Sequence, residues 1–323
     1  MRVVATADVL VVGGGTWAVA AALAARAAGA EVFLLAPRPY LGEDLCATLR
    51  LELEEGQSPQ TDLARRIFAA GGATTPLCVK KVLDAALLAA GVRFLFGCFV
   101  TDVLRDADGM VCGAVAASRA GRDAVIAKVL VDATDRACAA RLAGAECRPW
   151  PRGTVEFQRV VIAPDASGRP VPATRRLALT LPDGGFRSLC RAEQEARDRT
   201  YVEGQLRASE SLFFVPQDPV VGQTPARLWR GTERADLGHF RPAGLSRLYV
   251  LSGCADVPRP AAAELLRPTG LTALGERVGQ VAAAEALALG LPRGPHVSPR
   301  APAGELPGEV REPPGALRPW ATA

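Results

Sequence analysis

The strongest constraint on the fold is a run of three glycines between an apolar strand and an alanine-rich helix near the N-terminus. Residues 9–12 are continuously apolar, which is typical of a strand buried on both faces of a parallel sheet. Residues 13–15 are glycine, residues 17–28 form a helical segment that ends at Gly29, and residues 32–35 make a second apolar strand. This order predicts a βαβ unit that binds a nucleotide.

The small residues of this turn have separate tasks in such a unit. Gly13 permits the tight turn, Gly15 lets the backbone approach a pyrophosphate, and Ala18 keeps the helix close to the strand. The first turn of the helix then offers unpaired N–H groups and the positive end of the helix dipole to the phosphates. The turn therefore predicts a dinucleotide site.

The second strand ends without the residue that usually holds the ribose. A carboxylate normally accepts a hydrogen bond from the ribose at this point, whereas this chain has Ala36, Pro37 and Arg38. Arg38 would suit the 2′-phosphate of NADP(H). Alternatively, a flavin-type site could hold the ribose through the backbone and other side chains, or the site could have decayed. These residues alone leave the three options open.

Charge and cysteine content exclude several classes of protein. The chain of 323 residues carries a formal net charge of +4, which is too small to indicate a nucleic-acid partner. Its eight cysteines include no C-x-x-C pair and it has two histidines, so neither a disulfide framework nor a metal site is expected. Neither a secretory signal nor a membrane-spanning segment is evident. The sequence therefore predicts a cytoplasmic protein without nucleic-acid or membrane partners.

The apolar pattern divides the chain into four parts. Residues 1–149 contain the βαβ unit and a run of strands with a hairpin turn at 106–109. Residues 150–244 are richer in arginine, proline and phenylalanine, and we expect a smaller inserted domain there. Residues 245–291 return to a buried strand and a small-residue helix that close the first domain, and the proline-rich residues 292–323 are expected to be a disordered tail.

Two later segments carry a resemblance to a known family. Residues 129–146, VLVDATDRACAARLAGAE, are an apolar strand that ends in Asp132-Ala133-Thr134 and is followed by a helix. Residues 248–287 contain a strand, a turn at Gly253, a loop and a helix with two glycines. Together with the first glycine turn, these segments resemble the FAD-dependent oxidoreductases of the glutathione-reductase-like, two-dinucleotide-fold superfamily. The resemblance is strongest to the subgroup with fumarate-reductase-like and glucose-inhibited-division-like relatives.

The resemblance implies an α/β fold and FAD as the cofactor. A Rossmann-like FAD-binding domain would combine a parallel sheet, helices and a small antiparallel β-meander, and the insertion would be a smaller α+β substrate domain. The pyrophosphate of FAD would lie on the first glycine turn, and the late glycine segment would contact the ribityl chain and the flavin ring. Gly275 and Gly279 would pack the final helix against its neighbours.

Carried over position by position, the resemblance assigns cofactor contacts to the glycine turn, the end of the second strand, the following loop, and three later segments. Three positions depart from the family pattern: Trp17 is bulky, Asp135 replaces a glycine, and the ribose carboxylate is absent. The implied cofactor-binding residues are Gly13, Gly14, Gly15, Thr16, Trp17, Ala18, Ala36, Pro37, Arg38, Leu41, Gly42, Glu43, Val100, Ala133, Thr134, Gly253, Asp256 and Arg267.

The function implied is that of an FAD-dependent oxidoreductase that transfers hydride between the flavin and an unidentified small molecule. No residue stands out as a catalytic acid or base, because His239 is expected on a surface loop and Cys46 is expected to be a buried structural thiol. Two alternatives remain. The chain could be a non-catalytic or degenerate FAD- or nucleotide-binding protein, or an NADP(H)-binding oxidoreductase.

Overall fold

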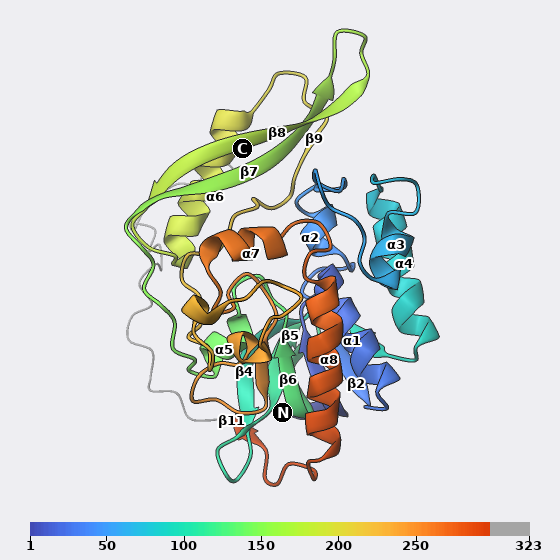
Figure 1. Cartoon of the computed structure of the whole chain (residues 1–323), viewed down its shortest axis with the longest axis vertical. Helices are drawn as coiled ribbons and strands as arrows, with labels where there is room; N and C mark the ends of the chain where they lie inside the picture. The colour runs from blue at the N-terminus through green and yellow to red at the C-terminus, as the bar shows by residue number, and fades with distance from the viewer. Residues whose placement is uncertain (298–323) are drawn as a thin grey trace, which may run out of the picture.

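The computed structural model describes residues 1–297, which form an α/β body with a smaller β-rich cap above it (Figure 1). The strands of the body are β1 (Arg2–Val12), β2 (Val32–Leu35), β3 (Arg93–Leu95), β4 (Phe99–Arg105), β5 (Val111–Ser118), β6 (Gly121–Asp132), β10 (Leu248–Val250) and β11 (His296–Val297). They make one mixed eight-stranded sheet in the order β11-β4-β5-β6-β1-β2-β3, with β10 beside β6. The predicted parallel sheet and antiparallel meander are both confirmed.

Strand β6 joins the two kinds of pairing. One edge of β6 pairs in parallel with β1 over the length of β1, from Arg2 opposite Asp123 to Val12 opposite Asp132. On the other edge, residues 121–126 pair antiparallel with β5 and residues 130–132 pair in parallel with β10. The apolar strand that the sequence predicted from residue 129 is the end of this longer, continuous strand. Because β1, β6 and β10 run in parallel, their carboxyl ends meet at one edge of the sheet, where open α/β folds bind ligands.

Two helices with many small residues pack against each other beside this sheet (Figure 1). They are α1 (Thr16–Ala27) and α8 (Thr272–Leu287). A Cβ atom on Gly275 would lie 2.7 Å from the backbone oxygen of Trp17, and one on Gly279 would overlap the backbone oxygen of Ala21. The predicted role of these two glycines in helix packing is therefore confirmed.

Shorter helices complete the body. After β2 come α2 (Glu43–Cys46), α3 (Asp62–Ile67) and α4 (Pro76–Ala89), whereas α5 (Cys138–Leu142) follows β6 and α7 (Arg259–Leu265) follows β10. Thr75 caps α4 by accepting a hydrogen bond from the backbone N–H of Cys78 at 3.2 Å, and Pro76 takes the first helical position. Helix α4 in turn packs against α1, α2 and α3.

The cap has its own sheet and its own apolar core. Strands β7 (Gly153–Pro164), β8 (Pro170–Leu181) and β9 (Arg207–Ala208) pair in the order β8-β7-β9, and helix α6 (Phe186–Thr200) packs on β7 and β8. Buried residues of that core include Phe157, Leu179 and Ala196. In Figure 1 the long β7–β8 ribbon extends beyond the body.

The connection from the cap back to β10 lies against the body. Val220 bridges to Cys147, and the fully buried side chain of Phe240 belongs to the core around α1 and α8. The domain boundaries at 150 and 244 stay predictions. Of the predicted disordered tail, residues 298–323 lie outside the described residues, whereas His296 and Val297 pair with β4.

We expect Gly279→Ala to destabilise the protein by about 1–3 kcal/mol, because the added methyl group meets the backbone of α1 and cannot be relieved by a side-chain rotation. Thermal unfolding followed by circular dichroism would measure the loss. Gly290→Ala is the matched control, since nothing lies within 4 Å of a Cβ at that position. Equal melting temperatures for both variants would contradict the close packing of α1 on α8.

Candidate cofactor and substrate site

The glycine turn leads from β1 into α1 at the carboxyl edge of the sheet. Gly13 has a φ of +128°, and a Cβ atom there would lie 2.6 Å from the backbone oxygen of Ala133 at the end of β6. A residue with a side chain would be strained at this φ and would collide with the neighbouring strand. The turn therefore has the tight geometry that the sequence predicted.

The N–H groups of this turn already donate to carboxyl groups of the same chain. The backbone N–H of Gly14 donates to Oε1 of Glu43 at 3.0 Å. Thr16 donates twice to Asp44, from its backbone N–H at 2.8 Å and from its hydroxyl at 2.7 Å. Both carboxylates come from the first turn of α2. The end of α1 that attracts anions is thus occupied by side chains of the same chain.

Trp17 covers the third glycine of the turn. Its side chain is only 5% exposed, and Nε1 donates to the backbone oxygen of Ala133 at 3.0 Å. A Cβ atom on Gly15 would lie 3.1 Å from the indole ring and 3.3 Å from Oδ1 of Asp44. Gly15 therefore faces protein atoms, whereas the sequence predicted that it would leave room for a pyrophosphate.

The loop before α2 is fixed against the turn. The backbone N–H of Gly42 donates to the backbone oxygen of Gly14 at 2.7 Å, and Leu41 is fully buried. Gly42 has a φ of +79°, and a Cβ atom there would overlap Val79 of α4. This backbone contact sets the position from which Glu43 and Asp44 reach the glycine turn.

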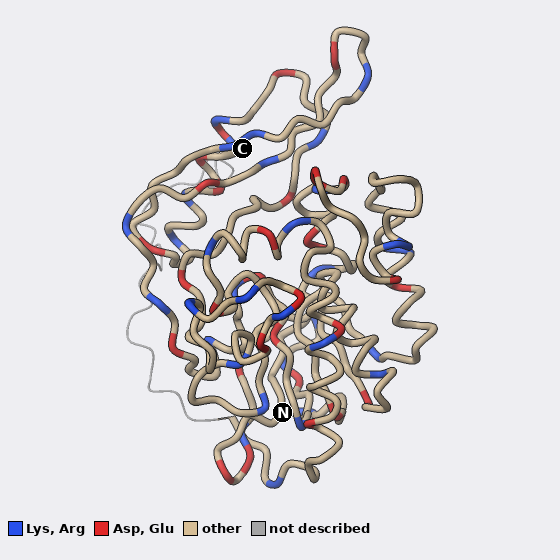
Figure 2. The backbone as a smooth tube through the Cα atoms, viewed as in Figure 1, with Lys and Arg blue, Asp and Glu red and all other residues tan. Residues whose placement is uncertain are grey.

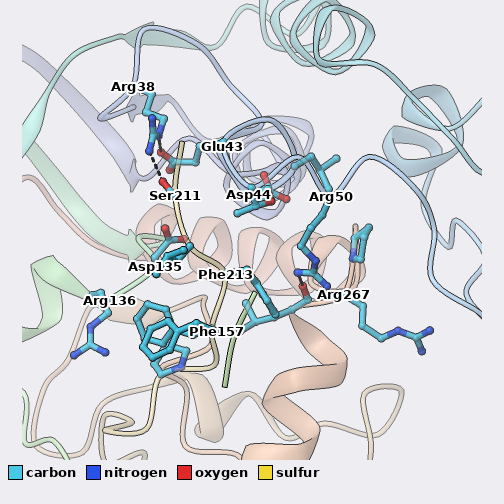
Figure 3. Close-up of a pocket in the computed structure, with 18 of the residues that line it drawn as sticks. Arg38, Glu43, Asp44, Arg50, Asp135, Arg136, Phe157, Ser211, Phe213 and Arg267 are labelled. Atoms are coloured by element: carbon cyan, nitrogen blue, oxygen red, sulfur yellow. Dashed lines mark hydrogen bonds and ion pairs between the residues drawn. The ribbon is translucent and has the colours of Figure 1, made fainter. Parts of the chain in front are cut away.

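A cavity of about 250 Å³ lies between the body and the cap (Figure 3). Its body side includes Trp17, Asp44 and Asp135, and its cap side is largely aromatic and aliphatic. Figure 3 shows Glu43 and Asp135 on one side of the cavity and Arg50 and Arg267 on the other. The lining residues from the cap and the segment after it include Phe157, Leu189, Leu212, Phe213 and Phe214.

The acidic groups beside the cavity are hard to ionise together. Burial, with the nearby charge of Asp135, raises the pKa of Glu43 above its usual range. Burial also raises the pKa of Asp44 to about 6, although its hydrogen bonds with Thr16 act in the opposite direction. The pKa of Asp135 is raised for the same reason, with Arg38 and Arg136 opposing. This edge of the sheet therefore already disfavours added negative charge.

Arg38, predicted at the ribose end of the cofactor, connects the body to the segment beyond the cap. It bonds Oε2 of Glu210 at 2.5 Å and Oγ of Ser211 at 2.6 Å, and its Nε lies 3.7 Å from Oε2 of Glu43 (Figure 3). Ala36 before it is fully buried, and Pro37 is half-buried. A phosphate on the ribose would have to displace one of these carboxylates.

The Asp-Ala-Thr end of β6 is held together internally. Asp132 is fully buried and accepts hydrogen bonds from the hydroxyl of Thr134 at 2.6 Å and from the backbone N–H of Ala140 at 2.8 Å. These bonds fix the turn into α5, so Asp132 is a structural carboxylate. Ala133 lies next to the glycine turn as the resemblance implied, but its backbone oxygen is bound by Trp17.

The late segment is divided between the cavity and the interior. A Cβ atom on Gly253 would lie 2.6 Å from Cδ1 of Leu266, so this glycine is packed against protein. Asp256 is 1% exposed, forms an ion pair with Arg148 at 3.1 Å, and does not line the cavity. Arg267 does line the cavity, while its Nε bonds Glu54 at 2.9 Å. Val100, near the start of β4, is also not among the lining residues.

Two expectations for other residues have opposite outcomes. Cys46 is buried, as predicted. The expectation that His239 lies on a surface loop is wrong: it is 1% exposed, its ring packs edge-on against Trp229, and Nδ1 lies 3.0 Å from the backbone oxygen of Asp256. Its short 3₁₀ segment, Leu237–Phe240, is folded into the core, which no periodic pattern in the sequence indicated.

Sequence reasoning missed most of the cap side of the cavity. Phe157, Phe213 and Phe214 belong to no motif, and the LFFVPQ run was the only local signal. Arg50 and Arg136 were also missed because nothing near them in the sequence marks a site. They meet only because the cap folds back over the carboxyl edge of the main sheet.

Residues 8–160 match a family of proteins described as FAD dependent oxidoreductase. This part of the chain, slightly less than half of it, is therefore similar to the FAD-dependent oxidoreductases. The description of that family names FAD. A search of curated proteins found no matching sequence.

Several solved structures share the fold at low sequence identity. The OxyS anhydrotetracycline hydroxylase from Streptomyces rimosus is 14% identical with a TM-score of 0.52, and the alignment covers 86% of this chain and 63% of that one. A geranylgeranyl bacteriochlorophyll reductase-like protein from Thermoplasma acidophilum is 13% identical with a TM-score of 0.51 (86% and 78% covered). Aklavinone-11 hydroxylase, solved with FAD and aklavinone, is 16% identical with a TM-score of 0.51 (86% and 62% covered). These likenesses show that the chain shares the Rossmann-like fold of these proteins.

In the arrangement described, the glycine turn does not fit the diphosphate of FAD. A diphosphate needs backbone N–H groups that point at it and are not otherwise bonded. Here Gly14 and Thr16 donate theirs to carboxylates, and Trp17 lies over Gly15. The family match and the local geometry therefore disagree at this one position.

Two further observations concern other kinds of function. Within residues 1–297, no group of three His, Cys, Asp or Glu side chains is arranged to hold a metal ion. None of the helices described over the same residues has the length and apolar character that a bilayer span requires.

We expect Asp44 to make the protein less stable as the pH rises from about 4 to about 6. Its pKa in the folded protein is about 6, above the value near 4 of an unfolded chain, so the folded state binds the proton more tightly across that interval. The free energy of unfolding of the wild type should therefore fall relative to that of Asp44→Asn, by on the order of 2 kcal/mol.

Urea unfolding of both proteins at several pH values would measure this difference. The exposed Asp62 supplies the control, because Asp62→Asn removes a carboxylate that is not buried. If the difference in unfolding free energy between the wild type and Asp44→Asn does not change with pH, folding does not raise the pKa of Asp44.

Proposed function

We propose that this protein is an FAD-dependent oxidoreductase, and that it acts on a small molecule with a flat, largely apolar surface, bound in the cavity between the body and the cap. The observation that carries the proposal is the composition of the cavity wall. One side consists of groups next to the glycine turn, and the other presents Phe157, Phe213 and Phe214. Pockets for small molecules are commonly lined by apolar and aromatic side chains with a few placed polar groups.

Two arginines that line the cavity are already bonded to other protein groups. The guanidinium carbon of Arg50 lies 3.7 Å from the centre of the Phe213 ring, and Nη1 of Arg50 donates to the backbone oxygen of Leu266 at 2.7 Å. Arg136 forms an ion pair with Asp218 at 2.8 Å. Both arginines are therefore neutralised or engaged. The substrate would meet an aromatic surface with few cations available to it.

Asp135 is the polar group best placed to act on a bound molecule. Its carboxylate lines the cavity and has no hydrogen-bond or ion-pair partner among residues 1–297. Burial raises the pKa of its carboxyl, so it would keep its proton to a higher pH than an ordinary aspartic acid and exchange it with a substrate hydroxyl or amine. FAD, when bound, would supply the redox chemistry.

We expect planar aromatic compounds to bind the full chain and raise its melting temperature more than saturated polar compounds of similar size. Phe213→Ala should weaken that binding several-fold, because it removes a stacking contact worth about 0.5–1.5 kcal/mol. Phe186→Ala is the control, since that ring is 86% exposed and does not line the cavity. Stabilisation by sugars or other saturated polar compounds alone would contradict the substrate class.

The choice of FAD over NADP(H) can be tested at Arg38. Because Glu210, Ser211 and Glu43 already engage its guanidinium, we expect Arg38→Ala to leave the ratio of NADPH to NADH affinity unchanged. Added FAD should bind saturably and non-covalently, and denaturation should release it intact. Titration of both proteins with FAD, NADH and NADPH would measure this. A large loss confined to NADPH would favour the nicotinamide alternative, and no saturable FAD binding would contradict FAD as the cofactor.

The fumarate-reductase-like and glucose-inhibited-division-like subgroup is also proposed. It is supported by the Asp-Ala-Thr end of β6 and by the glycine segment after β10, although the similar solved structures include proteins named as hydroxylases. We further propose that the residues assigned from the resemblance form the cofactor-binding set. For FAD to bind there, Glu43 and Trp17 would have to move from the positions that they occupy in the structure.

A cytoplasmic protein without a nucleic-acid partner is proposed on two grounds. All eight cysteines are unpaired thiols, which is typical of a reducing compartment. Along the backbone in Figure 2, Lys and Arg residues are interspersed with Asp and Glu residues over the described part of the chain, and the formal net charge is only +4, so the charge pattern does not support a nucleic-acid partner. The domain division at 150, 244 and 291 is proposed on the sequence pattern.

A further inference from the structure

We propose that Glu43 and Asp44 close the diphosphate position of this protein from within, so that FAD binds at full strength only when α2 releases both carboxylates from the first turn of α1. The proposal rests on the function above, in that FAD is taken as the ligand of this site. It adds that the carboxyl groups of Glu43 and Asp44 occupy the position where the phosphates of FAD would bind.

The first support is the pairing of donors and acceptors. A backbone N–H forms one strong hydrogen bond at a time, and the turn offers its donors within a few residues. Gly14 donates to Glu43 at 3.0 Å, and Thr16 donates to Asp44 through both N–H and hydroxyl at 2.8 and 2.7 Å. A diphosphate bound there would have to replace three hydrogen bonds to carboxylate oxygens with its own.

The second support is that these carboxylates are not ordinary helix caps. The N-cap residue of α1 is Gly15, which has no side chain to cap the helix. The acceptors come instead from another helix, 28 and 29 residues further along the chain. Their position depends on the Gly42 to Gly14 backbone hydrogen bond of 2.7 Å and on a left-handed Gly42 packed against α4. The closure is therefore built by tertiary structure.

The third support is the charge and shape of the surroundings. Asp135 stands near Glu43 and Asp44, and Arg38 is the cation closest to Glu43, with 3.7 Å between Nε and Oε2. A diphosphate would add two negative charges to this group of carboxyls. Trp17, held by its hydrogen bond to Ala133, fills the space over Gly15 through which the phosphates would approach. Charge and steric exclusion thus act in the same direction.

The test compares the wild type with Glu43→Ala/Asp44→Ala, which removes both acceptors and frees the N–H groups. A second variant, Glu43→Gln/Asp44→Asn, keeps the shape and removes only the charge. Glu55→Ala/Asp62→Ala is the control, since it removes two exposed carboxylates elsewhere. Each full-length protein would be titrated with FAD by flavin fluorescence and with inorganic diphosphate by calorimetry, after circular dichroism has verified folding.

We expect the double alanine variant to bind FAD and inorganic diphosphate at least about tenfold more tightly than the wild type, which corresponds to about 1.4 kcal/mol. The amide variant should show a smaller gain, because its side-chain oxygens still accept from the turn, and the control should match the wild type. If the alanine variant does not fold, the gain in the amide variant decides.

The outcomes separate this proposal from the proposed function. Tighter diphosphate binding without any FAD binding would support the closure and contradict FAD as the cofactor. FAD affinities that are equal in the wild type and both variants would overturn the closure and leave the function in place. An unchanged diphosphate affinity in a folded alanine variant would also overturn the closure.

Discussion

The close approach of the glycine turn to the end of β6 is the contact on which the rest of the site depends. Gly13 brings its backbone so near to Ala133 that a Cβ atom would lie 2.6 Å from the backbone oxygen. The same oxygen accepts the indole N–H of Trp17. Because α1 starts here, the turn fixes both the direction of the helix and the position of its positive end. Glycines of α8 then let a second helix pack directly on the backbone of α1.

This contact also explains why buried carboxylates can be tolerated at the edge of the sheet. Glu43 and Asp44 lose their hydration, and burial raises their pKa values, but each recovers hydrogen bonds from N–H groups that the helix leaves unpaired. Helix and carboxylates therefore satisfy one another. An external anion can use the same N–H groups only by taking the place of these side chains, so cofactor binding and the position of α2 are coupled.

The cap is connected to this edge of the sheet through Arg38. The guanidinium bonds Glu210 and Ser211 from the segment beyond the cap and also lies close to Glu43. The cavity wall, the ribose end of the site and one of the two closing carboxylates thus share a single cation. The three acceptors face different nitrogens of this guanidinium, Nη1, Nη2 and Nε, so a movement of the cap that displaced Arg38 would also displace the cation beside Glu43.

The sequence by itself determined the βαβ unit, the meander, the packing glycines of α8 and the resemblance to FAD-dependent oxidoreductases, because each depends on local spacing that a short window of residues displays. The tertiary structure decided the occupants of the site. Asp44 reaches Thr16 across 28 residues of chain, Trp17 turns onto Gly15, and the phenylalanines of the cap meet Asp135 over the edge of the sheet. His239 was misjudged because its burial comes from packing against Trp229. Hydrogen bonds and contacts of this kind depend on how distant segments pack, and periodicity in the sequence carries no record of that packing.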